Sequence, residues 1–201
     1  FANQWSAVGK DGTSTIVKEL IHQCDSSGAS LNLNSKVDSI KIDSGFITEI
    51  SVNNKPQKIL PTDYVINTSS LTKLSEIHGV RSKVRYRGVY LVYIHTTNLY
   101  PFPDSADFIY VDDHDISFNR VSDQNTFVEN PNTESTVLCC EITYEHGDEL
   151  DNKKSSVVEN TVQKDLIKLG LLKENQILGS SSLKLPEVYP MFELNYRENL
   201  N

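Results

Sequence analysis

The sequence has few cysteines and no hydrophobic run long enough to cross a bilayer. Three of its 201 residues are cysteine, and Cys139 and Cys140 are neighbours whose side chains would point to opposite faces of a strand. A small, odd number of cysteines fits a reducing compartment better than a disulfide scaffold, so we expect a cytoplasmic protein. The most hydrophobic stretch, residues 88–94, has only the length of a strand, so we expect no membrane span.

The sequence also has fewer basic than acidic residues. Lysine and arginine number 19 against 27 aspartates and glutamates, which gives a net charge of −8. Such a chain repels phosphate backbones unless its basic residues are concentrated in one place, so we expect neither nucleic acid nor an acidic membrane surface as a partner. Charged residues at 23% and hydrophobic residues at 38% are typical of a globular protein and argue against a disordered tail.

The self-contained catalytic motifs are missing. There is no P-loop, HExxH, Cys-x-x-Cys or Gly-x-Ser-x-Gly, and the nearest approach to a dinucleotide fingerprint, Gly9 and Gly12, follows no strand. Residues 112–115 (Asp-Asp-His-Asp) contain metal-ligand types, but polar residues between two strand-like runs are first of all a solvated turn, so we predict no metal site. Cys139 and Cys140 have no basic neighbour in sequence and are interpreted as packing residues.

Hydrophobic periodicity in the first third of the chain predicts a short helix and several strands. Apolar residues recur every three or four positions over 13–28, which is typical of an amphipathic helix, and alternate over 30–34, which predicts a strand. Two strands, 37–42 and 46–52, flank a tight Asp-Ser-Gly turn. Residues 63–67 (Asp-Tyr-Val-Ile-Asn) look like another, buried strand.

The remainder predicts an antiparallel sheet with a flanking helix. Residues 84–97 are rich in β-branched and aromatic residues on both parities, so we expect a long strand covered on both faces. A helix over 155–169 would end at Gly170. The other expected extended segments are the hairpin strands 108–111 and 116–121, strand 136–144, and the chain over 176–185. The expected fold class is therefore α+β.

Arg120 is the basic residue whose setting carries most information. It stands inside the apolar run of residues 116–121, in a largely acidic protein. A guanidinium cannot be neutralised, so an arginine inside a strand needs either a carboxylate partner or an anionic ligand. Phosphate is one candidate ligand, and a structural ion pair is the alternative.

Residues 14–20, 27–40 and 62–68 resemble the middle of the FAD-dependent amine oxidases, protoporphyrinogen oxidases and UDP-galactopyranose mutases. In that superfamily such a helix, strand and hairpin belong to a Rossmann-like FAD-binding domain. The resemblance implies that the strand around Val37 lies beside the adenosine half of FAD and touches it through backbone atoms.

Residues 108–111, 117–122 and 184–190 look like the substrate domain of the mutase-like branch. The resemblance implies that Tyr110, Arg120 and Tyr189 contact the diphosphate of a nucleotide sugar. A guanidinium fork suits a diphosphate, and phenolic hydroxyls add neutral donors. Phe127 stands where the mutases can carry another tyrosine, so one donor is missing and UDP-galactopyranose itself is less well supported as the substrate.

The resemblance implies a partial FAD-binding domain over 1–70, an antiparallel substrate-binding domain over 71–190, and the start of a return to the FAD domain over 191–201. We therefore expect a middle portion of a longer FAD-dependent oxidoreductase or mutase, acting on a small molecule such as a nucleotide sugar in polysaccharide biosynthesis. Without the helix terminus that cradles the pyrophosphate, the chain alone should bind FAD poorly. The alternative is a non-catalytic module that binds an anionic ligand or a protein partner through the sheet of residues 84–144.

Overall fold

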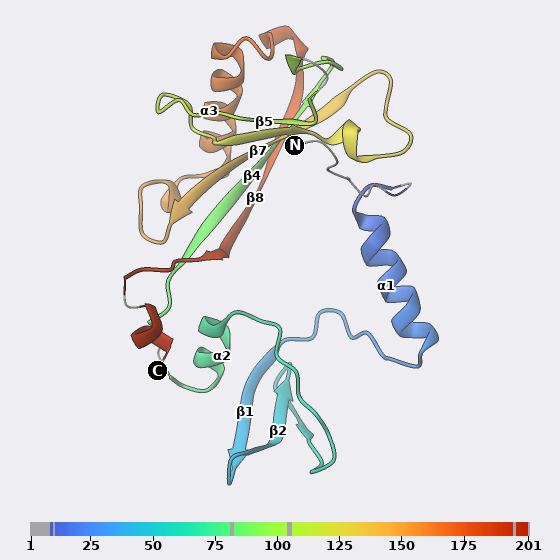
Figure 1. Cartoon of the computed structure of the whole chain (residues 1–201), viewed down its shortest axis with the longest axis vertical. Helices are drawn as coiled ribbons and strands as arrows, with labels where there is room; N and C mark the ends of the chain where they lie inside the picture. The colour runs from blue at the N-terminus through green and yellow to red at the C-terminus, as the bar shows by residue number, and fades with distance from the viewer. Residues whose placement is uncertain (1–8, 10, 81–82, 104–105, 195, 201) are drawn as a thin grey trace. The chain divides into compact units, whose positions relative to one another are not determined.

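The computed structural model describes residues 9, 11–80, 83–103, 106–194 and 196–200. It divides into two compact units (Figure 1). We call residues 1–28 and 86–189 the sheet unit, and residues 29–85 and 190–201 the hairpin unit. Helices together with two antiparallel sheets confirm the expected α+β class. Residues 1–8 and 201, at the ends of the predicted segments 1–70 and 191–201, lie outside the described residues.

The hairpin unit contains a three-stranded antiparallel sheet in the order β1-β2-β3. The turn between β1 (Val37–Asp43) and β2 (Phe46–Val52) has positive φ at Ser44 and Gly45, which is the geometry of a tight two-residue hairpin and confirms the predicted pair of strands. Strand β3 (Lys55–Lys58) was not predicted, nor was helix α2 (Leu71–Ile77). The cap of α2 is Ser70, whose hydroxyl accepts the Lys73 N–H at 3.3 Å.

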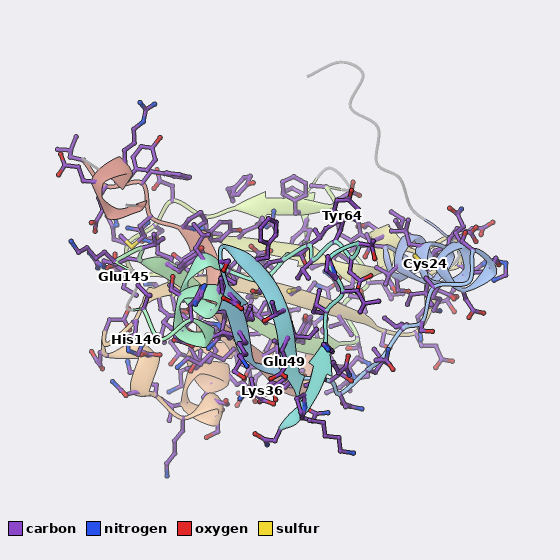
Figure 2. All side chains as sticks on the ribbon, turned by 90° about the horizontal axis from the view of Figure 1, so that it is seen from below. Cys24, Lys36, Glu49, Tyr64, Glu145 and His146 are labelled. Atoms are coloured by element: carbon purple, nitrogen blue, oxygen red, sulfur yellow. The ribbon has the colours of Figure 1, made fainter. Side chains whose placement is uncertain are left out.

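Two predicted strands of the hairpin unit are wrong. Neither residues 30–34 nor residues 63–67 form a strand, and the Tyr64 ring, labelled in Figure 2, is 94% exposed. The apolar side chains of Val65 and Ile66 are exposed too. A strand exists only when a neighbour satisfies its backbone groups, and no described strand pairs with these segments. Residues 63–67 thus have the composition of a strand, but no described strand forms a ladder with them.

The sheet unit is built on a five-stranded sheet in the order β5-β6-β7-β4-β8. Its long central strands, β4 (Tyr86–Thr96) and β7 (Thr136–Glu145), pair antiparallel along their whole length, which confirms the two strands predicted there. Strands β5 (Phe108–Tyr110) and β6 (Arg120–Asp123) form the predicted hairpin with a longer loop than expected. Strand β8 (Ile177–Pro190) extends five residues beyond the predicted end at residue 185.

The hydrophobic core lies between this sheet and helix α3 (Ser155–Lys168), which confirms the predicted helix. Figure 1 shows α3 along one face of the sheet. Gly170, with a φ of 73°, follows the helix as predicted. The main core side chains are Tyr90, Val92, Ile94, Phe118, Val121, Leu138, Cys140, Ile142, Val158, Val162 and Leu166. Strand β4 is covered completely on this face and only partly on the other, where His95 is exposed, so the expectation of cover on both faces is half right.

Helix α1 (Ser14–Ser26) confirms the predicted N-terminal helix, but no residue of it is buried. Its apolar stripe, Ile16, Val17, Leu20 and Ile21, is exposed. Among the described residues, every fully buried hydrophobic side chain belongs to the sheet unit. Among the described residues, no helix is both long enough and apolar enough to cross a membrane.

Candidate functional site: the open face of the sheet

The face of the five-stranded sheet opposite α3 carries Tyr110 and Arg120, two of the residues that the sequence singled out. Side chains alternate along a strand, so Val92, Val121 and Cys140 enter the core while their neighbours point the other way. The cross-strand register places those neighbours in two rows. We call them the open face: the rows are Tyr110, Arg120, Glu141 and Leu91, and then Phe108, Ser122, Cys139 and Tyr93.

Arg120 is paired with a carboxylate on this face. Its Nε–H donates to Glu141 Oε1 at 2.9 Å, and an Nη2–H donates to the same oxygen. The hydrogen bond to Glu141 is the main cause that raises the pKa of the guanidinium, against burial, which lowers it; Tyr110 contributes less. The guanidinium carbon also lies 5.9 Å from the centre of the Phe108 ring. The sequence indicated that Arg120 needs either a carboxylate partner or an anionic ligand, and the structure shows a carboxylate partner, Glu141.

The open face carries a second pair of the same kind. Arg87 lies directly opposite Glu145 in the β4–β7 ladder, and its Nη2 is 3.3 Å from Glu145 Oε1. Each arginine therefore faces a glutamate on the neighbouring strand, and the two pairs leave the face close to neutral. Glu141 accepts two of the five N–H donors of Arg120, so donors remain for another acceptor. An anion could bind there only by sharing the guanidinium with Glu141.

The open face offers no reactive thiol. Burial, the largest cause, raises the pKa of Cys139 to about 11, with the Glu141 charge acting in the same direction. The pKa of Tyr93 is raised by burial and by the neighbouring Cys139. On the core side, burial raises the pKa of Cys140 well above its ordinary value. Both cysteines are protonated at neutral pH and pack against neighbours, as interpreted from the sequence.

The structure brings together two of the four predicted substrate residues. Tyr110 and Arg120 are direct cross-strand partners. Tyr189 lies near the end of β8, three strand steps from β6 and beside the start of β4, so it is more than about 14 Å from Arg120 at the usual strand spacing. Phe127 is the last residue of the short helix η2 (Gln124–Phe127) and is half-buried. Its backbone carbonyl lies close to Gly12, so that a Cβ added to Gly12 would be 3.0 Å from the carbonyl oxygen. Neither Tyr189 nor Phe127 lies next to Arg120 in the ladder.

The sequence analysis missed Glu141 and Phe108, which contact Arg120 together with the predicted Tyr110. A signal for Glu141 existed, because it is the lone charged residue in the apolar run of residues 137–142. A charged side chain in such a run predicts an oppositely charged partner on a neighbouring strand. Its pairing with Arg120 depends on the strand order β6-β7, which the sequence does not specify.

Val37 lies in the hairpin unit, at the start of β1, and lines a cavity of about 760 Å3. The lining is mixed: apolar side chains such as Ile40, Ile50 and Val65 alternate with polar and charged ones, namely Lys36, Asp38, Asn67, Thr68, Ser69, Lys73 and Glu76. Strand β1 is at the edge of its sheet within the described residues, so one side of its backbone is not used by a ladder. The apolar residues beside this strand edge offer packing surface for a flat group, and the charged residues lie around them. The placement of Val37 beside the adenosine half of FAD, implied by the resemblance, stays a prediction.

The Asp-Asp-His-Asp segment of residues 112–115 is an exposed turn. Asp113 Oδ1 accepts the Asp115 N–H at 2.9 Å, which is the local bond expected of a turn. Within the described ranges, no three histidine, cysteine or acidic side chains come close enough together to hold a metal ion.

Comparisons with known proteins give the fold. No family model matches the chain, and no curated protein matches its sequence. Among solved structures, a protein described as a protoporphyrinogen oxidase from Exiguobacterium sp. 255-15 matches 92% of this chain, with a TM-score of 0.68 and 14% identity. A reduced UDP-galactopyranose mutase matches 96% of the chain, with a TM-score of 0.72 and 16% identity. The resemblance recognised in the sequence is therefore confirmed at the level of fold. The chain spans 42% and 43% of these two proteins.

Proposed function

We propose that this chain is a portion of a longer FAD-dependent flavoenzyme and contains its substrate domain. The observation that carries the proposal is the fold, which is shared over more than nine-tenths of the chain with an oxidase and a mutase more than twice as long. In this proposal residues 1–70 belong to the FAD-binding domain, residues 71–190 form the substrate domain, and residues 191–201 return to the FAD domain.

The distribution of apolar surface supports a longer parent protein. The described part of the hairpin unit has no fully buried hydrophobic side chain, and the strand-like segment 63–67 has no neighbour in a sheet. Helix α1 likewise exposes its apolar stripe. Burying an exposed leucine or isoleucine is worth about 1.5–3 kcal/mol, so such surfaces are normally covered. The remainder of a flavin domain would supply the cover.

The open face is the proposed substrate surface. Tyr110 and Arg120 would contact the diphosphate of a nucleotide sugar, with the distant Tyr189 and Phe127 as further contributors, in cytoplasmic polysaccharide biosynthesis. Bound FAD would supply the hydride-accepting or nucleophilic chemistry, and this chain would position the substrate and set the local charge. Arg120 would hold the diphosphate through the donors that Glu141 does not use, and the Phe108 ring would limit the movement of the guanidinium. Val37 would border the adenosine half of the cofactor.

The test compares two proteins made from the same gene. The protein extended at both ends by its own flanking sequence is expected to purify yellow, with the absorbance spectrum of a bound flavin. The chain of 201 residues alone is expected to purify colourless. An extended protein that stays colourless and leaves added FAD free in equilibrium dialysis would contradict the proposal and would favour the non-catalytic binding module.

A further inference from the structure

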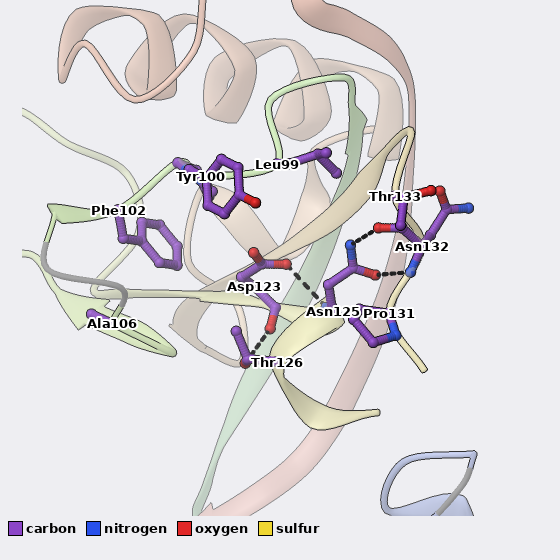
Figure 3. A pocket seen from close by; sticks show the side chains of 11 residues that line it. Leu99, Tyr100, Phe102, Ala106, Asp123, Asn125, Thr126, Pro131, Asn132 and Thr133 are labelled. Atoms are coloured by element: carbon purple, nitrogen blue, oxygen red, sulfur yellow. Dashed lines mark hydrogen bonds between the residues drawn. The ribbon is translucent and has the colours of Figure 1, made fainter. Parts of the chain in front are cut away.

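A cavity of about 430 Å3 lies in the sheet unit, away from the open face. It is formed by residues 99–102 and 106, which lie between β4 and β5, together with the end of β6, helix η2 and the turn before β7. One side of it is mainly apolar and includes the rings of Tyr100 and Phe102, and the other side is polar (Figure 3). Its lining residues include Tyr100, Phe102, Pro131, Asp123, Asn125 and Asn132. The volume is within the range of small-molecule sites.

Asp123 is the charged residue among the described residues that line this cavity, and only one of its two carboxylate oxygens accepts a hydrogen bond from them. The residue is 5% exposed, and Oδ1 accepts the Asn125 N–H at 3.0 Å and the Thr136 hydroxyl. Oδ2 has no hydrogen-bond partner among the described residues. Among the described residues, no side-chain oxygen is both sealed from solvent and without a hydrogen-bond partner, so Oδ2 keeps some accessible surface, and Asp123 lines the cavity. Figure 3 shows it pointing away from Asn125, toward the side on which Tyr100 lies.

The polar wall around Asp123 is held by hydrogen bonds within the wall. The Asn125 amide donates to the carbonyl oxygens of Asn132 and Ser135 and accepts the Asn132 N–H. Asn125 therefore holds the wall in place and leaves Asp123 as the acceptor that faces the cavity. An acceptor held in place by its surroundings loses little entropy when a donor binds to it.

The remaining lining residues indicate which ligand charge the cavity favours. No lysine, arginine or histidine is among the lining residues that the structure describes, so an anion would meet the Asp123 carboxylate without compensation. A carboxylate accepts hydrogen bonds and does not donate them. The rings of Tyr100 and Phe102 supply apolar contact, and aromatic faces attract cations. We propose that this cavity binds an organic ammonium ion, a primary amine carried on an apolar or aromatic group, through Asp123 Oδ2 and the aromatic wall.

The probe is benzylamine, with benzyl alcohol as its neutral counterpart of the same shape. Both are titrated into the chain of 201 residues while amide shifts are followed by two-dimensional NMR. Benzylamine is expected to perturb the amides of Tyr100, Asn125 and Thr133 and to bind at least tenfold more tightly than benzyl alcohol. Charge-assisted hydrogen bonds are about twice as strong as neutral ones, which accounts for the preference.

Three variants separate the contributions. Asp123→Asn keeps an oxygen for the Asn125 N–H and the Thr136 hydroxyl, and is expected to weaken benzylamine at least tenfold while leaving benzyl alcohol unchanged. Tyr100→Ser, at a well-exposed position, should weaken both probes. The matched control is Asp112→Asn, the same charge change at an exposed turn, which should alter neither.

Three outcomes would overturn the site. They are equal affinity for amine and alcohol, amine binding that survives Asp123→Asn, or no shift of the cavity amides by either probe. In any of these cases Asp123 would serve only to cap η2 and hold Thr136.

Discussion

Replacing Glu141 by glutamine removes the negative charge that pairs with Arg120 and leaves the side-chain shape almost unchanged. If Arg120 binds a diphosphate, as proposed, the incoming anion must share the guanidinium with Glu141 and is repelled by it. Glu141→Gln should therefore tighten the binding of a nucleoside diphosphate. If the pair only stabilises the sheet, the same substitution should destabilise the protein and give no gain in binding.

The size of the gain follows from the charges and their exposure. A phosphate on the far side of the guanidinium would lie about 6 Å from the Glu141 carboxylate. Two unit charges at that separation repel by about 0.7 kcal/mol in water and by about 3 kcal/mol at an effective dielectric of about 20. The Arg120 side chain is 38% exposed and Glu141 16%, so solvent screening favours the lower part of that range. We expect about 1 kcal/mol, or about fivefold tighter binding.

The assay is calorimetric titration of UDP at low ionic strength into the wild type, Glu141→Gln and Arg120→Ala. Arg120→Ala should weaken UDP by about 1.5–3 kcal/mol, because a charge-assisted hydrogen bond is lost. The matched control is Glu145→Gln, which unpairs Arg87 on the same face and should leave UDP affinity unchanged. Unchanged or weaker binding by a folded Glu141→Gln variant, or full binding by Arg120→Ala, would refute the reasoning.

Three predictions concern stability. Leu166→Ala, at a fully buried position of α3, should cost about 2–5 kcal/mol in the free energy of unfolding measured with urea, and equal losses in Leu166→Ala and its half-exposed neighbour Ile167→Ala would contradict the assigned core. The hydrogen bond from Lys184 lowers the pKa of Asp151, so the unfolded state binds more protons than the folded state. The resulting contribution to stability is complete above about pH 4 and is lost at lower pH. Asp151→Asn should therefore lose less stability between about pH 7 and pH 3 than the wild type. Gly88→Ala should destabilise by about 1–3 kcal/mol, since its Cβ would clash with the Tyr144 ring of β7, and an unchanged urea midpoint would contradict this clash.

The parts of the fold that could be predicted from sequence are those whose signal is local. The Asp-Ser-Gly turn of residues 43–45 indicates the β1–β2 hairpin, and Gly170 marks the end of α3. Strands β4 and β7 are long enough for their composition to be decisive. These signals depend on backbone conformation and periodicity, which need no knowledge of distant neighbours.

The secondary-structure predictions are wrong or incomplete where the structure depends on contacts with segments distant in sequence. Residues 63–67 have the composition of a buried strand, yet no described strand pairs with them and Tyr64 is exposed. The short helix α2 depends on a single cap at Ser70 and has too few residues for a periodic pattern to be visible.

The candidate site shows the same division. The sequence identified Arg120 as needing a partner, and the resemblance paired it with Tyr110, which the ladder confirms as a neighbour. The identity of the carboxylate, Glu141, follows from the order of β6 and β7, which depends on long-range pairing. The half-occupied carboxylate of Asp123 also depends on tertiary contacts, because Thr136 and Asn125 both bind the same oxygen.

The central claim is that the open face presents a substrate to a flavin held by the longer parent protein. The most direct measurement is the absorbance spectrum of the extended protein during a titration with UDP, for the wild type, Arg120→Ala and Arg87→Ala. We expect a bound flavin whose spectrum shifts with UDP, at least tenfold weaker UDP binding in Arg120→Ala, and wild-type behaviour in Arg87→Ala. A colourless protein, or a bound flavin whose spectrum ignores UDP in all three proteins, would contradict the claim.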